Sequence, residues 1–222
     1  MSKIYSVTLT GISPLLLHSD SIEFQDDLKK WRLVPANKKL SVAGDDRSPA
    51  WSWLGCLYHD GVNVTMPSDN LMRCLLEGGT GVVVPGGRGT KTFKSQTQSG
   101  MMVTEEAWPI LIDGKPVPFG PLAALREESE FADHKTICAE MGIDLFVKRA
   151  KIGTSKHVRV RPRFHRWSLS GTLSVWDDQI TLAVLEDILE ICGSQKGLGD
   201  WRPSGRTPGP YGRFTSTIKL IK

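Results

Sequence analysis

The pattern of hydrophobic and polar residues predicts a chain built from amphipathic strands and helices. Strict alternation from Ile4 to Gly11 is typical of a strand with one buried face, and 213–221 repeats this pattern near the end of the chain. A further strand is expected around 101–112. Helices are expected at 68–79 and 181–193, because apolar residues recur there every three or four positions between a hydroxyl cap and a glycine stop.

A change of phase interrupts the strand pattern in the second half of the chain. In "VRVRPRF" (158–164) the apolar residues hold even positions and three arginines hold odd ones, whereas in "WSLSGTLSV" (167–175) the apolar residues hold odd positions. A shift of one residue turns side chains to the other face of a sheet, so a bulge or break is expected near 163–166. Pro162 fits an interrupted or edge strand.

The order of the elements indicates an α+β protein. A β-α-β unit followed by a second one matches a ferredoxin-like or RRM-like βαββαβ core, in which an antiparallel sheet carries two helices on one face. We expect one domain over residues 1–222, with insertions at 13–65 after the first strand and at 113–157 between the second and third strands. A glycine-rich loop, 197–213, separates the second helix from the last strand.

Composition favours a globular protein of a reducing compartment. Hydrophobic residues make up 40% and charged residues 23% of the chain. No apolar run reaches the roughly 18 residues of a membrane span, and the N-terminal segment lacks a signal-peptide pattern, so we expect a cytoplasmic protein with no membrane partner. The cysteines are scattered and form no C-x-x-C pair, which favours structural thiols: Cys56, Cys74, Cys138 and Cys192.

Candidate catalytic chemistry is sparse. The five histidines lie far apart in the sequence, so neither a metal site nor a cofactor is expected. Asp26 and Asp27, like the pair at 45–46, could hold a divalent ion or act as general acid and base, although solvated loop acids are the simpler interpretation. His157 and His165 lie among arginines and could support metal-free RNA cleavage, although polar contacts within a phosphate-binding strand are simpler.

Phosphate recognition has more support. The net charge is only +4, but 148–166 contains eight Lys or Arg residues and no acid. Alternate arginines on a strand face one way, and each guanidinium can grip a phosphate at two oxygens. The glycine-rich loop adds glycines that allow close backbone approach, together with cations and aromatic rings, a combination typical of single-strand binding.

The predicted nucleic-acid-binding residues come from three segments. They are Arg88, Lys91, Lys94, Lys156, Arg159, Arg161, Arg163, Arg166, Gly197, Gly199, Trp201, Arg202, Arg206, Gly209, Gly212 and Arg213.

The layout resembles the RAMP superfamily of CRISPR-associated proteins. "GLGDWRPSGRTPGPYGRF" (197–214) lies where that family carries its glycine-rich loop, and "VTLTGISPLLLHSD" (7–20) is similar to its opening strand and turn. The segment 113–157 lies where the backbone subunits of RNA-guided complexes carry a thumb. "RPRF…W" and "G-D-x-R-P…GRF" are also similar to small stand-alone RAMP-like proteins of phages and mobile elements.

Three functions follow as hypotheses. The resemblance implies a non-enzymatic subunit that binds single-stranded RNA, a guide and possibly a target, as a homo-oligomer along the strand beside other subunits of an RNA-guided complex. The second hypothesis is an RNA endonuclease that uses Asp26, Asp27 or His165. The third is a mobile-element protein that mimics or inhibits such a complex.

Overall fold

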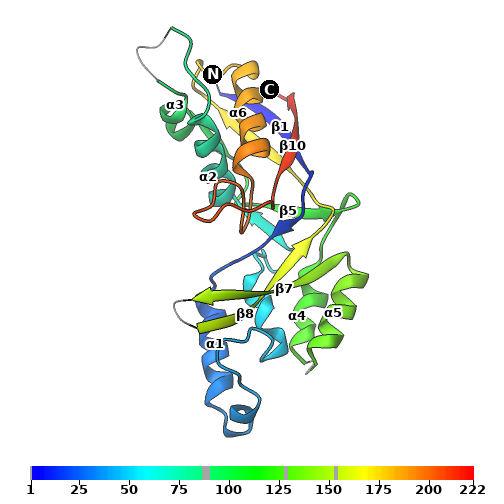
Figure 1. Ribbon diagram of the computed structural model, residues 1–222. Coiled ribbons are helices and arrows are strands. Elements are labelled where there is room, and N and C mark those ends of the chain that lie inside the picture. The colour runs from blue at the N-terminus through cyan, green and yellow to red at the C-terminus, as the bar shows by residue number, and fades with distance from the viewer. Residues whose placement is uncertain (1, 87–90, 128–129, 153–154) are drawn as a thin grey trace. The chain divides into compact units, whose positions relative to one another are not determined.

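The computed structural model divides the chain into two compact units, and each is described here by itself (Figure 1). The described residues are 2–86, 91–127, 130–152 and 155–222. Unit 1 comprises Met1–Leu15, Thr65–Pro116 and Arg166–Lys222, and unit 2 comprises Leu16–Val64 and Val117–His165. The two segments of unit 2 largely overlap the insertions predicted at 13–65 and 113–157.

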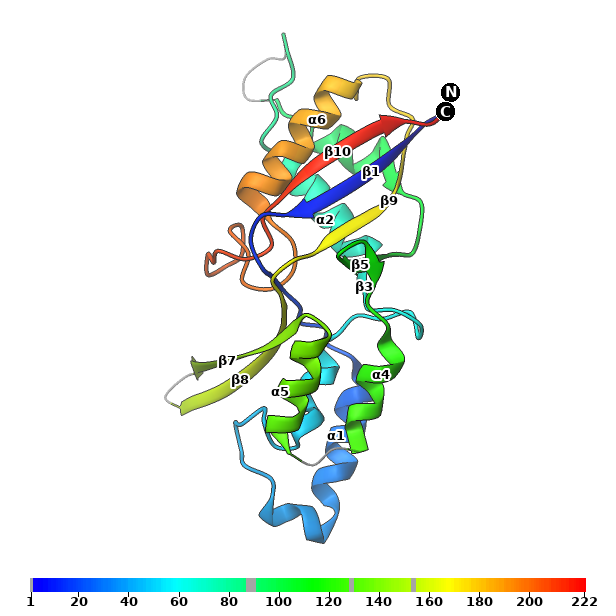
Figure 2. The ribbon, with the colours of Figure 1, turned by 90° about the vertical axis from the view of Figure 1, so that its right-hand side faces the viewer.

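Unit 1 contains an antiparallel sheet in the order β10-β1-β9-β5-β3, with β4 also paired to β9 and β6 to β5. Figure 2 shows β10, β1 and β9 side by side. Val7 at the centre of β1 lies opposite Ile218 of β10 on one side and Gly171 of β9 on the other. The strands are β1 (Lys3–Gly11), β3 (Thr65–Pro67), β4 (Met101–Val103), β5 (Ala107–Ile112), β6 (Lys115–Pro116), β9 (Ser168–Val175) and β10 (Phe214–Leu220).

Two helices cover one face of this sheet. They are α2 (Ser68–Gly79) and α6 (Leu182–Ile191), the latter continued by a π-helical turn, Cys192–Lys196, and the shorter α3 (Lys94–Ser99) packs beside α2. Alternate residues of the strands point into the layer between helices and sheet, among them the fully buried Val7 and Leu169. The amphipathic patterns at 68–79 and 181–193 therefore predicted these two helices correctly.

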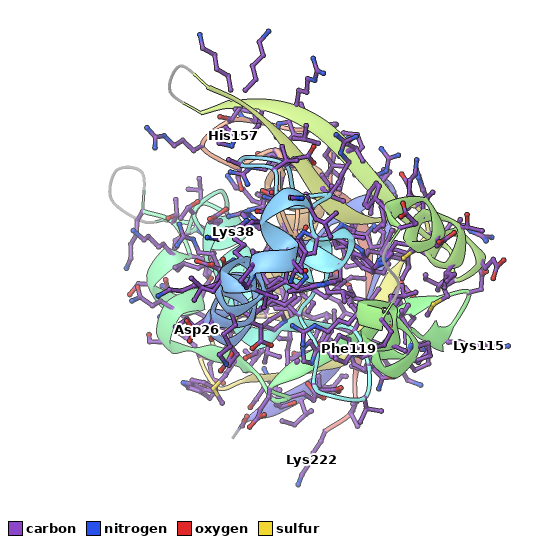
Figure 3. The ribbon with its side chains drawn as sticks, turned by 90° about the horizontal axis from the view of Figure 1, so that it is seen from below. Asp26, Lys38, Lys115, Phe119, His157 and Lys222 are labelled. Atoms are coloured by element: carbon purple, nitrogen blue, oxygen red, sulfur yellow. The ribbon has the colours of Figure 1, made fainter. Side chains whose placement is uncertain are left out.

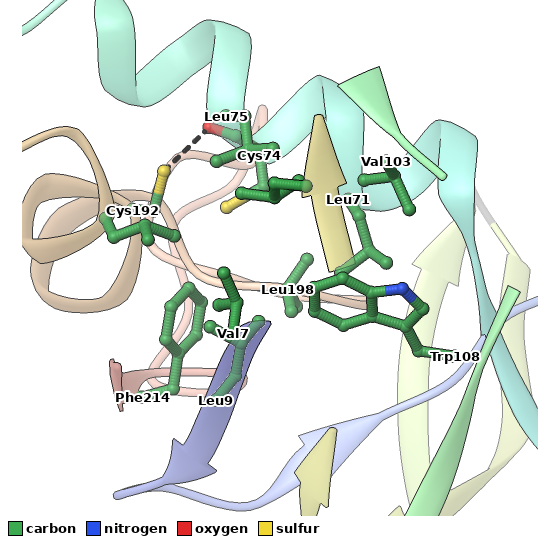
Figure 4. A pocket seen from close by; sticks show the side chains of 12 residues that line it. Val7, Leu9, Leu71, Cys74, Leu75, Val103, Trp108, Cys192, Leu198 and Phe214 are labelled. Atoms are coloured by element: carbon green, nitrogen blue, oxygen red, sulfur yellow. Dashed lines mark hydrogen bonds between the residues drawn. The ribbon is translucent and has the colours of Figure 1, made fainter. Parts of the chain in front are cut away.

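The core of unit 1 is closely filled. A small cavity of about 10 Å³, shown in Figure 4, is lined by residues of α2, α6, the π-helical turn, the sheet and Leu198. A space of this size and lining holds no ligand and stays dry. At its edge the Cys192 thiol donates a hydrogen bond to the Cys74 carbonyl oxygen at 3.1 Å. All four cysteines of the chain are free and buried.

The other face of the sheet carries hydroxyl groups. β1 contributes Ser6, Thr8 and Thr10, and the neighbouring strands contribute further serines and threonines. The hydroxyls of Thr8 and Ser170, which lie opposite one another in β1 and β9, are 3.1 Å apart. The clean alternation in the sequence thus reflects apolar residues under the helices and hydroxyls on the opposite side.

Unit 2 combines helices with a smaller sheet in the order β2-β8-β7. Its elements are β2 (Leu15–Leu16), α1 (Ile22–Leu33), the 3₁₀ turns η1 (Pro35–Lys39), η2 (Ala50–Cys56) and η3 (Leu125–Glu127), α4 (Phe119–Ala124), α5 (Phe131–Glu140), β7 (Ile143–Ile152) and β8 (Ser155–Phe164). Its core contains Trp53, whose indole N–H donates to Nδ1 of the buried His134 at 3.0 Å. No helix in the described ranges is long and apolar enough to span a bilayer.

The break inferred from the change of phase is confirmed. β8 ends at Phe164 and β9 begins at Ser168, and the division between the two units falls in this interval. The strand is not interrupted at Pro162, which pairs with Leu145 of β7, and β8 has β2 as its other neighbour. The change of phase therefore separates two strands of different sheets, and no bulge within one strand is needed.

Glu105 joins β5 to β9. Its carboxylate accepts hydrogen bonds from the Trp108 indole at 2.8 Å and from the Thr172 hydroxyl and amide at 2.7 and 3.1 Å. Gly171 lies directly beneath the indole, where a Cβ would be 2.0 Å from Nε1. Burial raises the pKa of Glu105, but the hydrogen bonds from Thr172 and Trp108 outweigh it and hold the pKa below its ordinary value.

Glu105→Gln is expected to lower the free energy of unfolding by about 1–3 kcal/mol at neutral pH, because charge-assisted hydrogen bonds are lost. A carboxyl with a lowered pKa stabilises the fold above its ordinary pKa and loses this effect as the pH falls through the folded value. The variant and the parent should therefore converge in acid. Urea denaturation at several pH values measures this, with the exposed neighbour Glu106→Gln as control. Equal losses in both variants would contradict the role of Glu105.

Candidate nucleic-acid interface

The arginines predicted to hold phosphates form a row on one face of β8. Arg159, Arg161 and Arg163 alternate along the strand, as the sequence predicts. Paired residues of an antiparallel ladder point to the same face, so the row shares its face with residues of β7. Opposite the three arginines lie Lys148, Phe146 and Asp144, in that order.

Each arginine of this row has a carboxylate partner. Arg159 and Arg161 donate from Nη1 to the two oxygens of Asp46 at 2.9 and 3.4 Å. Arg163 pairs with Asp144, its Nε donating at 2.9 Å. These arginine side chains are at most 35% exposed. Two carboxylates thus serve three arginines, so the charge of the row is compensated in part within unit 2, and phosphate binding there would compete with these carboxylates.

The other face of the β7–β8 pair carries exposed cations. Arg149 and Lys151 lie two residues apart on β7, and Lys151 lies directly opposite Lys156 of β8. Within the described residues, no acid forms an ion pair with any of these three, which we call the strand-end cluster. Like charges placed opposite one another destabilise a strand pair. A bound anion would relieve the repulsion between these cations.

Sequence analysis identified only one member of the strand-end cluster, Lys156. Arg149 and Lys151 were missed because 113–157 was interpreted as an insertion without a strand pattern. The sequence does contain the relevant pattern. Arg149 and Lys151 are separated by one residue, and such residues share a face when their segment is a strand.

The glycine-rich loop, 197–213, is anchored on Glu77 of α2. Arg202 donates from Nη1 and Nη2 to the two carboxylate oxygens at 2.7 and 3.0 Å, and the Ser204 hydroxyl and Arg73 Nε donate at 2.7 and 2.8 Å. Burial would raise the pKa of Glu77, but hydrogen bonds from Arg202, Ser204 and Arg73 and the charge of Arg202 lower it to about 2. Arg202 is therefore committed to holding the loop.

The glycines of the loop allow it to pack against itself. A Cβ at Gly212 would lie 1.8 Å from the Leu198 carbonyl oxygen, and the Leu198 amide donates to the Gly212 carbonyl at 2.9 Å. A Cβ at Gly209 would lie 2.0 Å from the Trp201 carbonyl oxygen. Gly197, Gly199 and Gly212 have φ angles of 72°, 75° and 70°. The glycines therefore do allow close backbone approach, as predicted, but the segments that approach one another are two halves of the loop itself.

Two arginines of the loop lie on its surface. Arg206 is exposed and has no ion pair among the described residues, and Arg213 is exposed, with Nε donating to the Ser194 carbonyl at 3.2 Å. Trp201 packs within the loop, its ring centre 5.5 Å from that of Tyr211. Stacking of Trp201 on a base would therefore require the loop to rearrange.

The remaining predicted cations are scattered over unit 1. Lys91 and Lys94 are exposed, but Phe93 between them is only 3% exposed and packs in the core, so it offers no ring to a base. Arg166 forms an exposed ion pair with an aspartate after β5 at 3.2 Å. Arg88 lies outside the described residues.

The candidate catalytic residues do not come together. Asp26 is exposed on α1 and lies apart from β8, which carries His157 (Figure 3). Asp27 accepts a hydrogen bond at 2.9 Å from an arginine of η3. His165 Nε2 lies 3.7 Å from Asp144, which already pairs with the arginine row. Among the described residues, no group of three His, Cys, Asp or Glu residues is arranged to hold a metal ion.

No protein-family model matches this chain, and no curated protein matches its sequence.

Glu77→Gln is expected to lower the free energy of unfolding by about 2–3 kcal/mol at neutral pH, because Arg202 loses its compensating charge. A carboxyl whose pKa is about 2 stabilises the fold above its ordinary pKa of 4.5 and loses this effect as the pH falls toward 2. Denaturation from pH 7 to pH 2 should show the gap between variant and parent closing below pH 4.5. An exposed acid of α6, Glu186→Gln, is the control. A gap independent of pH would refute the assignment.

Proposed function

We propose that this protein is a non-enzymatic subunit of RAMP type that binds the backbone of single-stranded RNA. It acts in the cytoplasm as one of several copies along a guide strand, within a CRISPR-type RNA-guided complex. The observation that carries this proposal is the strand-end cluster of Arg149, Lys151 and Lys156, three exposed cations on one face of the β7–β8 pair.

The architecture of unit 1 supports a ferredoxin-like core. Along the chain its main elements run β1, α2, β4 with β5, β9, α6 and β10, and in the sheet β1 lies between β10 and β9. This order, with antiparallel neighbours and both helices on one face, supports the βαββαβ core that we propose. The glycine-rich loop then falls between the second helix and the last strand of the core, the position that prompted the comparison with RAMP proteins.

Electrostatics supports an RNA backbone as the ligand. Cations that lack a carboxylate partner gain most from a polyanion, which releases counterions when phosphates are neutralised. The strand-end cluster supplies three such cations, and Arg206 and Arg213 of the glycine-rich loop are also exposed. Phe93 and Trp201 are engaged in packing, so stacking on bases contributes little, and binding should depend weakly on sequence.

The two alternative functions have less support. An endonuclease needs its catalytic groups together, whereas Asp27 is held by an arginine and His165 shares Asp144 with the arginine row. A mimic or inhibitor of an RNA-guided complex would bind protein after removal of RNA.

The triple substitution Arg149→Gln, Lys151→Gln and Lys156→Gln should weaken binding of a labelled single-stranded RNA by about 30-fold or more. Each lost phosphate contact lowers the slope of log K against log salt by about 0.7, so the slope should fall by about 2. Fluorescence anisotropy from about 50 to 300 mM KCl measures both quantities.

The matched control removes the same charge from the same unit. Lys29, Lys38 and Lys39 are exposed on α1 and η1, and their triple glutamine variant should change affinity by less than about threefold. Circular dichroism verifies that both variants fold. Equal losses of RNA affinity in the two variants would show that the net charge of the protein, and not the strand-end cluster, attracts the RNA. An affinity that does not depend on salt would refute phosphate binding.

Assembly along the strand gives a separate prediction. On RNAs of about 20, 40 and 60 nucleotides, the number of bound copies should rise with length, as measured by native mass spectrometry. The triple variant of the strand-end cluster should show fewer copies at each length. One copy on every RNA would contradict repeated binding while leaving RNA affinity intact.

A further inference from the structure

Unit 2 contains an open cleft of about 490 Å³ that the proposed RNA site does not use. It is lined by the end of α1 with the turn that follows, by the stretch from 47 to 51, and by Arg126, Glu127 and Glu130. A volume of this size is in the range of pockets that hold drug-sized ligands. The residues that define its chemistry are Trp31, Arg47, Trp51, Arg126, Glu127 and Glu130.

The two arginines of the cleft are already compensated. Arg47 binds Asp45 through Nε and Nη2, at 2.9 and 2.6 Å. Arg126 donates to Asp27 at 2.9 Å. The pKa of each aspartate is lowered chiefly by the hydrogen bond from its arginine, so both pairs are ionised at neutral pH. An incoming phosphate would have to displace these carboxylates.

The two glutamates of the cleft are available. Glu127 and Glu130 are exposed, and neither forms an ion pair with a described residue. With the partners of its arginines included, and with Lys30, which also pairs with Asp27 at 3.6 Å, the cleft brings together three positive and four negative side chains. Its electrostatic preference is therefore for a cation.

The cleft also has aromatic walls that suit a planar cation. Trp31 and Trp51 meet edge to face with ring centres 6.4 Å apart. The Arg126 guanidinium lies 4.7 Å from the centre of the Trp51 ring while it pairs with Asp27. Unit 2 thus already binds one guanidinium, that of Arg126, between an indole and a carboxylate. Trp31, Glu127 and Glu130 offer a second indole and two further carboxylates in the same cleft.

We propose that this cleft binds an arginine side chain of a peptide segment from a partner protein. The guanidinium stacks on the Trp31 indole and pairs with Glu127 and Glu130, and the remaining volume accommodates flanking peptide backbone. Arginine is favoured over lysine because its planar fork both stacks on rings and matches carboxylates. The site is independent of RNA binding by the strand-end cluster.

Isothermal titration with the capped tripeptide acetyl-Ser-Arg-Ser-amide tests the site. The peptide should bind, and the same peptide with neutral citrulline in place of arginine should bind at least about 10-fold more weakly. Glu127→Gln with Glu130→Gln should also weaken the arginine peptide by about 10-fold, and Trp31→Leu by about threefold or more.

The matched control is Glu186→Gln with Glu190→Gln, which removes two exposed acids from α6 in unit 1 and should leave the peptide affinity unchanged. The triple variant of the strand-end cluster should also bind the peptide normally, so a failure of RNA binding and a failure of this site are separable. Absence of binding, equal binding of the citrulline peptide, or full affinity in the Glu127/Glu130 variant would overturn the proposal. Displacement of the peptide by the dinucleotide pUpU would assign the cleft to RNA instead.

Discussion

The pairing of half-buried arginines with carboxylates organises the polar structure of both units. A guanidinium removed from water loses several kcal/mol of hydration, which an anion at hydrogen-bond distance must replace. Glu77 does this for Arg202 and thereby fixes the glycine-rich loop on α2. Asp46 does it for Arg159 and Arg161 and thereby joins the segment after η1 to β8. Loss of either acid would leave a buried charge without compensation, so each is more important than an exposed ion pair.

A second constraint concerns how the tryptophans of unit 1 are accommodated. Each of three indoles lies where the Cβ of a glycine would otherwise be: Trp167 over Gly11, Trp108 over Gly171 and Trp201 against Gly209, at 2.3, 2.0 and 2.2 Å from the hypothetical Cβ. Glycine in a strand costs stability because it packs no side chain of its own. Here the indole fills the vacant space, so glycine and tryptophan act as one packing unit. This explains glycines at the end of β1 and in the middle of β9 that no turn requires.

The sequence predicted much of the fold of unit 1 and little of its ion pairing. Alternation and helical spacing are local properties, so β1, α2, α6 and β10 could be located directly from apolar positions. The partner of Arg159 could not be found in this way, because Asp46 lies 113 residues away along the chain. The sequence therefore predicted a phosphate site at the arginine row without revealing the two carboxylates that compensate part of its charge within unit 2. In unit 2 a regular alternation was described only for 158–164, and 13–65 and 113–157 were interpreted as insertions.

Charge pairing also separates residues that maintain the fold from residues available to a ligand. Arg159, Arg161 and Arg163 are engaged by acids and at most 35% exposed, whereas Arg149, Lys151 and Lys156 are exposed on the opposite face of the same two strands. The first set lowers the free energy of the folded chain, and the second raises it through like-charge repulsion of about 0.2–1 kcal/mol per opposed pair. A polyanion reverses the sign of that contribution. In the same way, a bound cation would lower the free energy of the exposed Glu127 and Glu130, because the arginines beside them are paired with other acids. In both places a cluster of charges without ion-pair partners among the described residues marks the surface that is proposed to bind.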